Sequence, residues 1–336
     1  MRAVICRQYG SPETLVVEDV PSPEPGPGQV AIDVHACGVQ FADSLFIQGK
    51  YQVKVPPPFS PGSEVAGVVK QLGAGVTSCT LGDRVLAFTY WGGFAERVVV
   101  DASRVMVIPE GIDDVSAAAM LVSHSTTLHA LRDRGALAAG ETLLVLGAAG
   151  GTGLAAIQIG KIMGARVIAA ASSEEKLAIC RTHGADAQIN YSRDDLREQI
   201  KSLTNGRGVN VVYDAVGGDL TEPAMRGMAQ FGRYLVIGFA AGSIPTIPIN
   251  LPLLKIFSIV GVFWGAFADM YPERQRAIVA QLFDWFLRDG LRPHVSAVFP
   301  LDRAADAILE VAQRRSTGKV VVLTAMSGAS NQFQGS

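Results

Sequence analysis

The sequence predicts an α/β protein of two domains, one built on a doubly wound parallel sheet and the other on an antiparallel, barrel-like sheet. Strands alternate with helical segments from about residue 121 to residue 263, which is typical of β-α-β units. Short apolar segments separated by turns fill residues 1–120, which is typical of antiparallel barrels. The chain has 336 residues, and hydrophobic cores tend to divide beyond roughly 250–300 residues.

The strands of both sheets follow from short apolar runs. The barrel-like domain is predicted from segments at residues 30–34, 66–69, 84–88 and 97–100. The parallel sheet is predicted from strands at 142–146, 166–171, 209–213 and 234–239, with helical segments at 154–159, 174–182 and 220–229. This alternation places helices on both faces of the parallel sheet.

The C-terminal part of the chain is predicted to return to the first domain. A strand at 258–263 is followed by an amphipathic helix at 272–288, a strand at 295–299, a helix at 304–314 and a strand at 319–323. The segments after residue 263 have no obvious partner in the parallel sheet. We therefore assign residues 1–121 and 264–326 to the barrel-like domain and 122–263 to the parallel-sheet domain, and we expect residues 327–336 to form a mobile tail.

Residues 233–255 contain a long uncharged run that resembles a membrane span in length. Pro245, Pro248 and Pro252 would remove helix hydrogen bonds that lipid cannot replace. We expect a buried strand followed by a proline-rich loop, and no membrane span. The N-terminus reaches a second charge at Arg7, too soon for the apolar core of a signal peptide.

Composition restricts the partners and the compartment. The 29 Lys and Arg residues nearly balance the 31 Asp and Glu residues and form no block of like charge, which argues against a nucleic-acid surface. The four cysteines include no C-x-x-C pair, which excludes a disulfide framework and a zinc knuckle. We expect reduced thiols, a cytoplasmic protein and small-molecule partners.

A glycine-rich turn follows the apolar run at 142–146 and precedes a helical pattern. A strand, a glycine turn and a helix start form a dinucleotide pyrophosphate site, because glycines let backbone N–H groups and the positive helix end approach the phosphates. The alternative is a turn that only reverses the chain. No G-x-x-x-x-G-K-[ST] motif occurs, which excludes a P-loop for ATP. The predicted pyrophosphate-binding residues are Gly147, Ala149, Gly150, Gly151, Thr152 and Gly153.

The next strand predicts which dinucleotide binds. It ends in Ser172 and Ser173 without the carboxylate that selects NAD, so a 2′-phosphate would not be repelled. Ser172, Lys176 and Tyr191 supply a hydroxyl, a cation and a phenol, which together favour NADPH. The alternative is a capping box formed by Ser172 and Glu175, with Lys176 as a solvated surface charge.

The order of motifs resembles the zinc-independent quinone oxidoreductase branch, which includes zeta-crystallin, of the medium-chain dehydrogenase/reductase superfamily. The resemblance covers nearly the whole chain and implies a GroES-like β-barrel catalytic domain beside a Rossmann-type domain, with the active cleft between them. The motifs that carry it lie at residues 38–43, 61–67, 82–85, 147–153, 213–218 and 318–320.

The resemblance also implies that no metal binds. Zinc alcohol dehydrogenases of this superfamily have Cys where this chain has Gln40, His where it has Ser63, and a third ligand near Val122. An amide, a hydroxyl and an alkyl group do not form a tetrahedral N/S zinc site. Hydride addition to an already electrophilic conjugated acceptor does not require a Lewis acid, so quinones and α,β-unsaturated carbonyls are the expected substrates.

By the same resemblance, the nicotinamide side is formed by Thr126, Ile237, Gly238, Phe239 and Val262. The substrate side involves the predicted catalytic residues, with Trp264 nearby. Alternatively, Tyr51 seals a loop and Asp43 is a capping or buried structural carboxylate. His124 and His129 are five residues apart, and we expect them to be packing or surface residues rather than ligands. The predicted catalytic residues are Gln40, Asp43 and Tyr51.

The function predicted from the sequence is an NADPH-dependent, zinc-independent reductase of quinones or similar conjugated acceptors. Two alternatives remain, an enoyl-thioester or alkenal reductase of the same fold, and a protein that binds NADPH without turnover. The uncharged segment 258–268 contains a predicted edge strand that favours a homodimer, although an ordinary buried strand would have the same pattern.

Overall fold

The computed structural model describes residues 1–327 and divides into two compact units. The first unit contains Met1–Val122 and the segment from Phe283 onward, and the second contains Ser123–Leu282. Within the described residues, no helix has both the length and the apolar character needed to cross a membrane. The tail predicted at 327–336 lies, apart from Ser327, outside the described residues.

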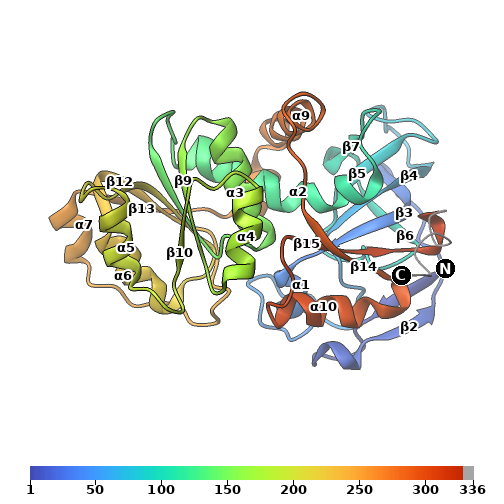
Figure 1. Cartoon of the computed structure of the whole chain (residues 1–336). Coiled ribbons are helices and arrows are strands. Elements are labelled where there is room, and N and C mark those ends of the chain that lie inside the picture. The colour runs from blue at the N-terminus through green and yellow to red at the C-terminus, as the bar shows by residue number, and fades with distance from the viewer. Residues whose placement is uncertain (328–336) are drawn as a thin grey trace. The chain divides into compact units, whose positions relative to one another are not determined.

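The first unit contains a seven-stranded sheet with the order β14-β15-β3-β4-β5-β7, and β6 also pairs with β3 (Figure 1). All its strand pairs are antiparallel except β14 with β15. Strands β1 and β2 form a separate antiparallel pair. The strands are β1 (Arg2–Ile5), β2 (Val16–Asp19), β3 (Gln29–Val39), β4 (Glu64–Leu72), β5 (Arg84–Phe88), β6 (Arg97–Asp101), β7 (Val105–Val107), β14 (Val295–Pro300) and β15 (Lys319–Leu323).

The long central strand β3 organises this unit. Its apolar residues are almost completely buried, and helices α1 and α10 pack against each other near the sheet. This arrangement confirms the antiparallel sheet predicted for residues 1–120, and it adds the parallel pair β14 and β15. The helices are α1 (Phe41–Phe46) and α10 (Ala304–Ala312), with α2 (Asp114–Leu128) and α9 (Pro272–Arg288) each shared between the units.

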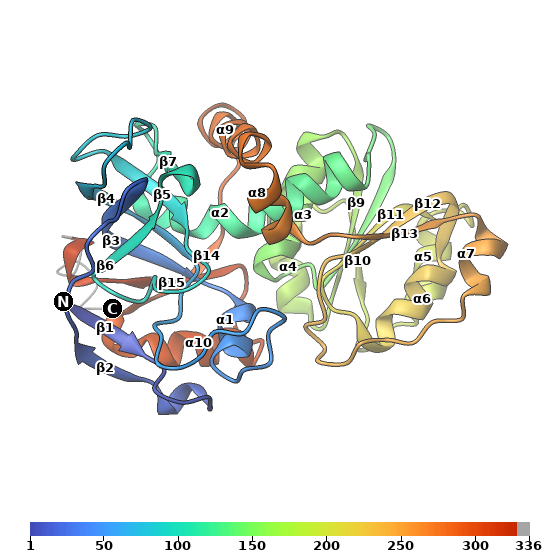
Figure 2. The same cartoon turned by 180° about the vertical axis from the view of Figure 1, so that it is seen from behind.

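The second unit is a six-stranded, all-parallel sheet with the order β10-β9-β8-β11-β12-β13. Helices α3 and α4 cover one face, and α5 and α6 cover the other (Figures 1 and 2). This confirms the doubly wound sheet, whose strand order reverses between β8 and β11. The strands are β8 (Thr142–Leu146), β9 (Arg166–Ala171), β10 (Ala187–Asn190), β11 (Val209–Asp214), β12 (Met228–Val236) and β13 (Ser258–Gly261).

The helices of the second unit differ from the prediction in more than one place. The helix predicted at 220–229 ends at Arg226, and β12 begins at Met228. The proline-rich segment after β12, predicted as a loop, contains the short helix α7. Pro252 is its third residue, where the backbone N–H has no partner within the helix, so the proline is tolerated. The helices are α3 (Gly151–Ile162), α4 (Glu174–Thr182), α5 (Leu196–Leu203), α6 (Thr221–Arg226), α7 (Asn250–Lys255), α8 (Trp264–Met270) and the π-helical turn His129–Arg134.

The border between the units also differs from the expected one. Residues 264–282 pack with the parallel-sheet unit, whereas the sequence assigned them to the barrel-like domain. The Trp264 indole N–H donates to Gln275 at 2.8 Å, and the Gln275 amide donates to the Ser125 hydroxyl at 3.2 Å. The Phe267 ring stacks on the His129 ring at 3.9 Å. These contacts hold α8 and the start of α9 against the end of α2.

Candidate functional site

The glycine turn has the geometry of a phosphate cradle. Gly147 lies in the left-handed region at φ +66°, and Gly150 caps α3 without a side-chain hydrogen bond. The N–H groups of the first helical turn therefore face outward with no side chain of the cap covering them. A Cβ on Gly153 would lie 2.4 Å from the Gly147 carbonyl oxygen, so α3 approaches the turn this closely only with glycine there.

Two hydrogen bonds, from Ala148 and from Thr127, tie the turn to its surroundings, and a third links Thr127 to Tyr213. The Ala148 N–H donates to the Ala170 carbonyl of β9 at 3.0 Å. On the other side, the Thr127 hydroxyl lies 2.9 Å from the Tyr213 hydroxyl and donates to the Thr152 carbonyl at 3.4 Å. Burial raises the pKa of Tyr213 to about 12, so its hydroxyl stays protonated. The predicted cofactor residue Thr126 is buried beside this contact.

The predicted NADPH-selecting residues lie at the carboxyl ends of β9 and β10. The Tyr191 N–H donates to the Ala171 carbonyl at 3.1 Å, which brings the end of β10 next to Ser172. The capping box predicted as the alternative for Ser172 is wrong, because Ser173 caps α4 and accepts from the Lys176 N–H at 3.3 Å. The half-buried Ser172 is therefore not used as the helix cap.

Sequence reasoning missed an ionic group at this same edge. The Glu174 carboxylate accepts from the Asn190 amide at 2.9 Å and lies 3.2 Å from the Arg193 guanidinium. The pKa of the exposed Arg193 is raised by its hydrogen bond to Asp194 and by both carboxylates. Arg193 stands two residues after Tyr191, a position that could have indicated it as a second cation beside Lys176.

The predicted nicotinamide residues lie at the opposite end of the same sheet edge. Ile237, Gly238 and Phe239 follow β12, and the N–H of Ile237 donates to the Asp214 carbonyl at 2.9 Å. Val262 follows β13, and its N–H donates to the Val236 carbonyl at 3.0 Å. The structure thus brings Gly238, Phe239 and Val262 together at the carboxyl ends of adjacent strands, where open parallel sheets bind ligands.

Asp214 organises the loop beside these residues, a role that sequence reasoning did not assign. Its buried carboxylate accepts from the N–H groups of Val216 and Gly217 at 2.8 and 2.9 Å, and from the Tyr234 hydroxyl. Burial and the Asp214 charge raise the pKa of Tyr234. A Cβ on Gly217 would lie 2.8 Å from the Phe239 ring, so glycine at this position lets Phe239 pack on the loop. The sequence signal that could have indicated this role of Asp214 is a carboxylate at the end of an apolar strand.

In the first unit, two predicted catalytic residues meet at the start of α1. Asp43 is completely buried and accepts from the N–H groups of Gln40 at 2.7 Å and Gly62 at 3.1 Å. Burial raises the pKa of Asp43 to about 7, although these two hydrogen bonds oppose the rise. The Gln40 side chain donates from Nε2 to the Glu64 carboxylate. Gln40 and Asp43 therefore belong to one polar cluster.

Tyr51, the third predicted catalytic residue, packs beside this cluster. Its ring lies 4.4 Å from the Phe46 ring between centroids. Burial, and then the charge of Asp43, raises the pKa of the Tyr51 hydroxyl. The hydroxyl is therefore a hydrogen-bond donor throughout the neutral range.

The cluster also contains a buried ion pair that the sequence did not reveal as a site. The Lys319 ammonium donates to the Glu64 carboxylate at 2.6 Å and to the Val39 carbonyl at 3.0 Å. The other Glu64 oxygen accepts from the Val122 N–H at 2.7 Å. The motif 318–320 contained Lys319, but a distance of 255 residues separates it from Glu64 in the chain. We name Gln40, Asp43, Glu64 and Lys319 the polar cluster.

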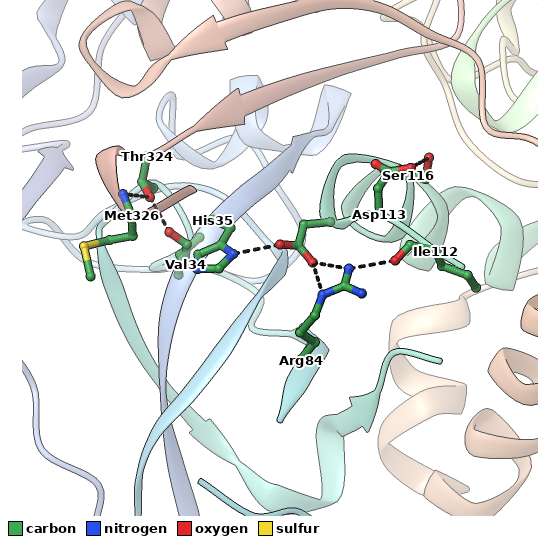
Figure 3. A network of polar contacts seen from close by, with 9 residues as sticks. Val34, His35, Arg84, Ile112, Asp113, Ser116, Thr324 and Met326 are labelled. Carbon is green, nitrogen blue, oxygen red and sulfur yellow. Dashed lines mark hydrogen bonds and ion pairs between the residues drawn. The ribbon is translucent and has the colours of Figure 1, made fainter. Parts of the chain in front are cut away.

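A second polar network anchors the start of α2 in the same unit. The Asp114 carboxylate accepts from the His35 ring at 2.7 Å and from Arg84 at 2.6 Å, and Arg84 also donates to the Ile112 carbonyl (Figure 3). Burial would raise the pKa of Asp114, but the His35 and Arg84 hydrogen bonds outweigh it and lower the pKa. This network fixes α2, whose later residue Val122 contacts Glu64.

His124 and His129, expected to be packing or surface residues, are both buried. His129 lies 3.0 Å from the Asp133 carboxylate and stacks on Phe267. Burial lowers the pKa of His129, against the opposing effect of Asp133. His124 is buried, with Nδ1 2.9 Å from the Ser123 hydroxyl. Within residues 1–327 no group of three His, Cys, Asp or Glu side chains is arranged to hold a metal ion.

A parallel sheet with a glycine turn after its first strand, combined with an antiparallel unit, defines a two-domain dehydrogenase. Family models agree: residues 26–110 match the alcohol dehydrogenase GroES-like domain, and residues 151–280 match the zinc-binding dehydrogenase domain. The chain belongs to the quinone oxidoreductase family of the medium-chain dehydrogenase/reductase superfamily. This membership confirms the resemblance and the fold class predicted from the sequence.

Three similar proteins illustrate the family. Quinone oxidoreductase-like protein 2 of Bos taurus is 41% identical over 96% of this chain and 92% of its own length. A quinone oxidoreductase of Pseudomonas aeruginosa is 37% identical over 94% of this chain and 97% of its own length. The structure of Escherichia coli quinone oxidoreductase complexed with NADPH is 25% identical, has a TM-score of 0.91, and covers 96% of this chain and 100% of that chain.

Proposed function

We propose that this protein is an NADPH-dependent reductase that transfers a hydride to quinones or similarly conjugated carbonyl acceptors without a metal ion. The observation that carries the proposal is the polar cluster. Gln40 stands at a position where zinc-dependent relatives have a ligand, and the Glu64 carboxylate beside it is neutralised by the buried Lys319 ammonium. The similar proteins named quinone oxidoreductases support the choice of acceptor.

The side chains at the three positions where zinc-dependent relatives have ligands, residues 40, 63 and 122, argue against zinc. Gln40 offers an amide and Ser63 a hydroxyl, and the Val122 side chain offers no ligand atom. Zinc sites in proteins use thiolate, imidazole and carboxylate ligands. A cation beside Glu64 would also meet the Lys319 ammonium and be repelled by it.

The described residues fit NADPH. The N-terminus of α3, whose cap Gly150 has no side chain, suits the pyrophosphate. Ser172, Lys176 and Tyr191 offer a hydroxyl, a cation and a phenol to the 2′-phosphate. Gly238, Phe239, Val262 and Thr126 would surround the nicotinamide. The relative complexed with NADPH supports this cofactor. When bound, NADPH supplies the hydride.

Gln40, Asp43 and Tyr51 would act on the acceptor. Negative charge develops on the acceptor oxygen during hydride addition, and donors placed there lower the barrier. The Gln40 amide has a second N–H beyond the one bonded to Glu64, and the Tyr51 hydroxyl stays protonated. With a pKa of about 7, Asp43 can hold the proton that the reduced oxygen takes up near neutral pH.

We further propose a homodimer formed through β13. This strand is at the edge of the parallel sheet, and Ser258, Ile259 and Gly261 are exposed. An unpaired edge with apolar side chains is a template for pairing with a second copy. The neighbouring helix α7 adds the exposed residues Leu253 and Leu254 to the apolar surface.

We also propose that the protein is cytoplasmic, a compartment in which its four buried cysteines stay reduced.

An acceptor panel tests the proposed function. Steady-state rates are measured with NADPH and 1,4-benzoquinone, crotonyl-CoA or a 2-alkenal, and we expect the highest kcat/KM with the quinone. A clear preference for the thioester or the alkenal would replace the quinone by that acceptor class. Tight NADPH binding without oxidation by any acceptor would show a binding protein instead of a reductase.

A further inference from the structure

Two charged side chains of the polar cluster have no role in the proposed reaction. Glu64 is completely buried and Lys319 is 4% exposed. A buried ion pair contributes little net stability compared with apolar residues of the same volume, because desolvation of both charges offsets their attraction. The position of this pair, in direct contact with Gln40, therefore requires a physical account of its own.

The contacts of Glu64 determine how the Gln40 amide is oriented. One Glu64 oxygen accepts from both Gln40 Nε2 and Lys319 Nζ, and the other accepts from the Val122 N–H. A carboxylate paired with an ammonium can only accept hydrogen bonds, so the amide group turned toward it must be the NH₂. Glu64 thus fixes which end of the amide faces the cluster, and Lys319 keeps Glu64 charged and in place.

Two glycines make room for this arrangement. A Cβ on Gly38 would lie 2.4 Å from the bonded Glu64 oxygen and 2.5 Å from the Ala118 carbonyl. A Cβ on Gly318 would lie 2.2 Å from the His294 carbonyl, which accepts from the Lys319 N–H at 2.7 Å. Strand β3, helix α2 and strand β15 can converge on the carboxylate only with glycine at these two positions.

We propose that Glu64 and Lys319 are positioning residues for the reductase reaction: they hold the Gln40 amide so that its second Nε2–H is presented to the acceptor oxygen. This inference rests on the proposed function. Lys319 fixes Glu64, and Glu64 fixes Gln40, so both residues act through Gln40 and neither touches the acceptor.

A double-mutant cycle tests whether Glu64 acts through Gln40. Glu64→Gln can donate to Gln40 as well as accept, so the amide loses its fixed orientation. We expect kcat with 1,4-benzoquinone to fall about 10- to 100-fold, the range that loss of precise placement produces. The NADPH dissociation constant should change less than about twofold. In a Gln40→Ala background, Glu64→Gln should lower kcat less than about twofold further, because its effect passes through Gln40. If Glu64→Gln lowered kcat equally in the wild-type and Gln40→Ala backgrounds, the proposal would be overturned.

Two further variants separate positioning from stability. Lys319→Met leaves the Glu64 charge without a partner and is expected to lower the melting temperature. The double variant Glu64→Gln with Lys319→Met buries no charge and should recover the melting temperature but not kcat. Recovery of both would assign the pair a purely structural role. Asp33→Asn is the matched control, since it breaks a largely buried Arg97 pair of 2.7 Å in the same sheet, and its kcat should equal that of the wild type.

A spectroscopic measurement tests the orientation independently of turnover. In protein labelled with ¹⁵N-glutamine, the two side-chain protons of Gln40, assigned with the Gln40→Ala variant, should give separate, widely spaced signals. In Glu64→Gln the chemical-shift difference between these two signals should decrease. Unchanged signals would overturn the proposal even if the wild type reduces no acceptor, so the failure of the proposed function and the failure of this inference are distinguishable.

Discussion

At the scale of single residues, Asp43 is a completely buried carboxyl group whose pKa is raised by its surroundings. The pKa of a free aspartate is 3.8, and burial raises that of Asp43 to about 7. Below pH 4 the group is protonated in both the folded and the unfolded protein. Between pH 4 and pH 7 it ionises mainly on unfolding, so its contribution to stability is lost as the pH rises.

Substitution of Asp43 by Asn should remove this pH dependence. A rise of about three pKa units corresponds to about 4 kcal/mol between the two protonation states. We expect the unfolding free energy of the wild type, relative to Asp43→Asn, to decrease by up to that amount from pH 4 to pH 8. Urea unfolding at several pH values measures it. The exposed Asp289→Asn serves as control, and parallel curves for wild type and Asp43→Asn would contradict the assigned burial.

Lys176 is the residue expected to select NADPH over NADH. Removal of one cation beside a 2′-phosphate removes a charge-assisted contact worth about 1.5–3 kcal/mol. Lys176→Ala should therefore weaken NADPH binding about 10-fold or more and leave NADH binding almost unchanged, as measured by fluorescence titration. Lys201→Ala, on helix α5 of the same unit, is a control that should alter neither affinity. An unchanged preference in Lys176→Ala would remove this residue from the cofactor site.

The sequence signal for the predicted NADPH-selecting residues is local. Ser172, Lys176 and Tyr191 gather at one sheet edge because each directly follows a strand or begins the next helix. The cap was misplaced by one residue, because Ser172 and Ser173 are equally good caps and only the path of the backbone selects Ser173. Glu64 and Lys319 escaped notice because nothing local links two residues so far apart in the chain.

At the scale of elements, the glycine turn offers a matched pair of substitutions. A Cβ on Gly150 would approach nothing closer than the Gly147 carbonyl at 3.4 Å, whereas a Cβ on Gly153 would lie 2.4 Å from the same oxygen. Gly150→Ala should thus keep the melting temperature and weaken NADPH binding about 10-fold, or about 1.4 kcal/mol. Gly153→Ala should lose both stability and binding.

Calorimetry and NADPH titration of the two variants check this prediction. Equal loss of melting temperature in both would mean that the turn is only a structural element. Full NADPH affinity in Gly150→Ala would show that the pyrophosphate does not lie against this turn.

Most elements were predictable because their signals are short-range. The strand Arg166–Ala171 and the helices Glu174–Thr182 and Pro272–Arg288 match the predicted bounds. Their apolar periodicity and their end residues lie within the element itself. Helix α7 was missed because its proline was taken to exclude a helix, although the first turn tolerates proline. Strand β14 pairs with β15, and β15 pairs with β3, but the apolar periodicity of a strand does not encode its partner.

At the scale of the whole molecule, the edge strand β13 is expected to join two copies of the chain. Ile259 is 38% exposed on this strand, and replacing it by Asp places a charge where two edges would pair. Ile259→Asp should shift the protein from dimer to monomer in light scattering after gel filtration. Val107→Asp is the matched control, because Val107 is an exposed apolar residue on β7, the edge strand of the other sheet. A monomeric wild type, or a dimer that survives Ile259→Asp, would contradict this interface.

The most direct test of the account is the oxidation of NADPH by 1,4-benzoquinone, measured with wild-type protein before and after dialysis against a metal chelator. Metal content is determined on the same samples. We expect quinone reduction with the same kcat before and after chelation, in protein that contains substoichiometric zinc. Loss of activity on chelation with recovery on adding Zn²⁺, or no oxidation of NADPH in either sample, would contradict it.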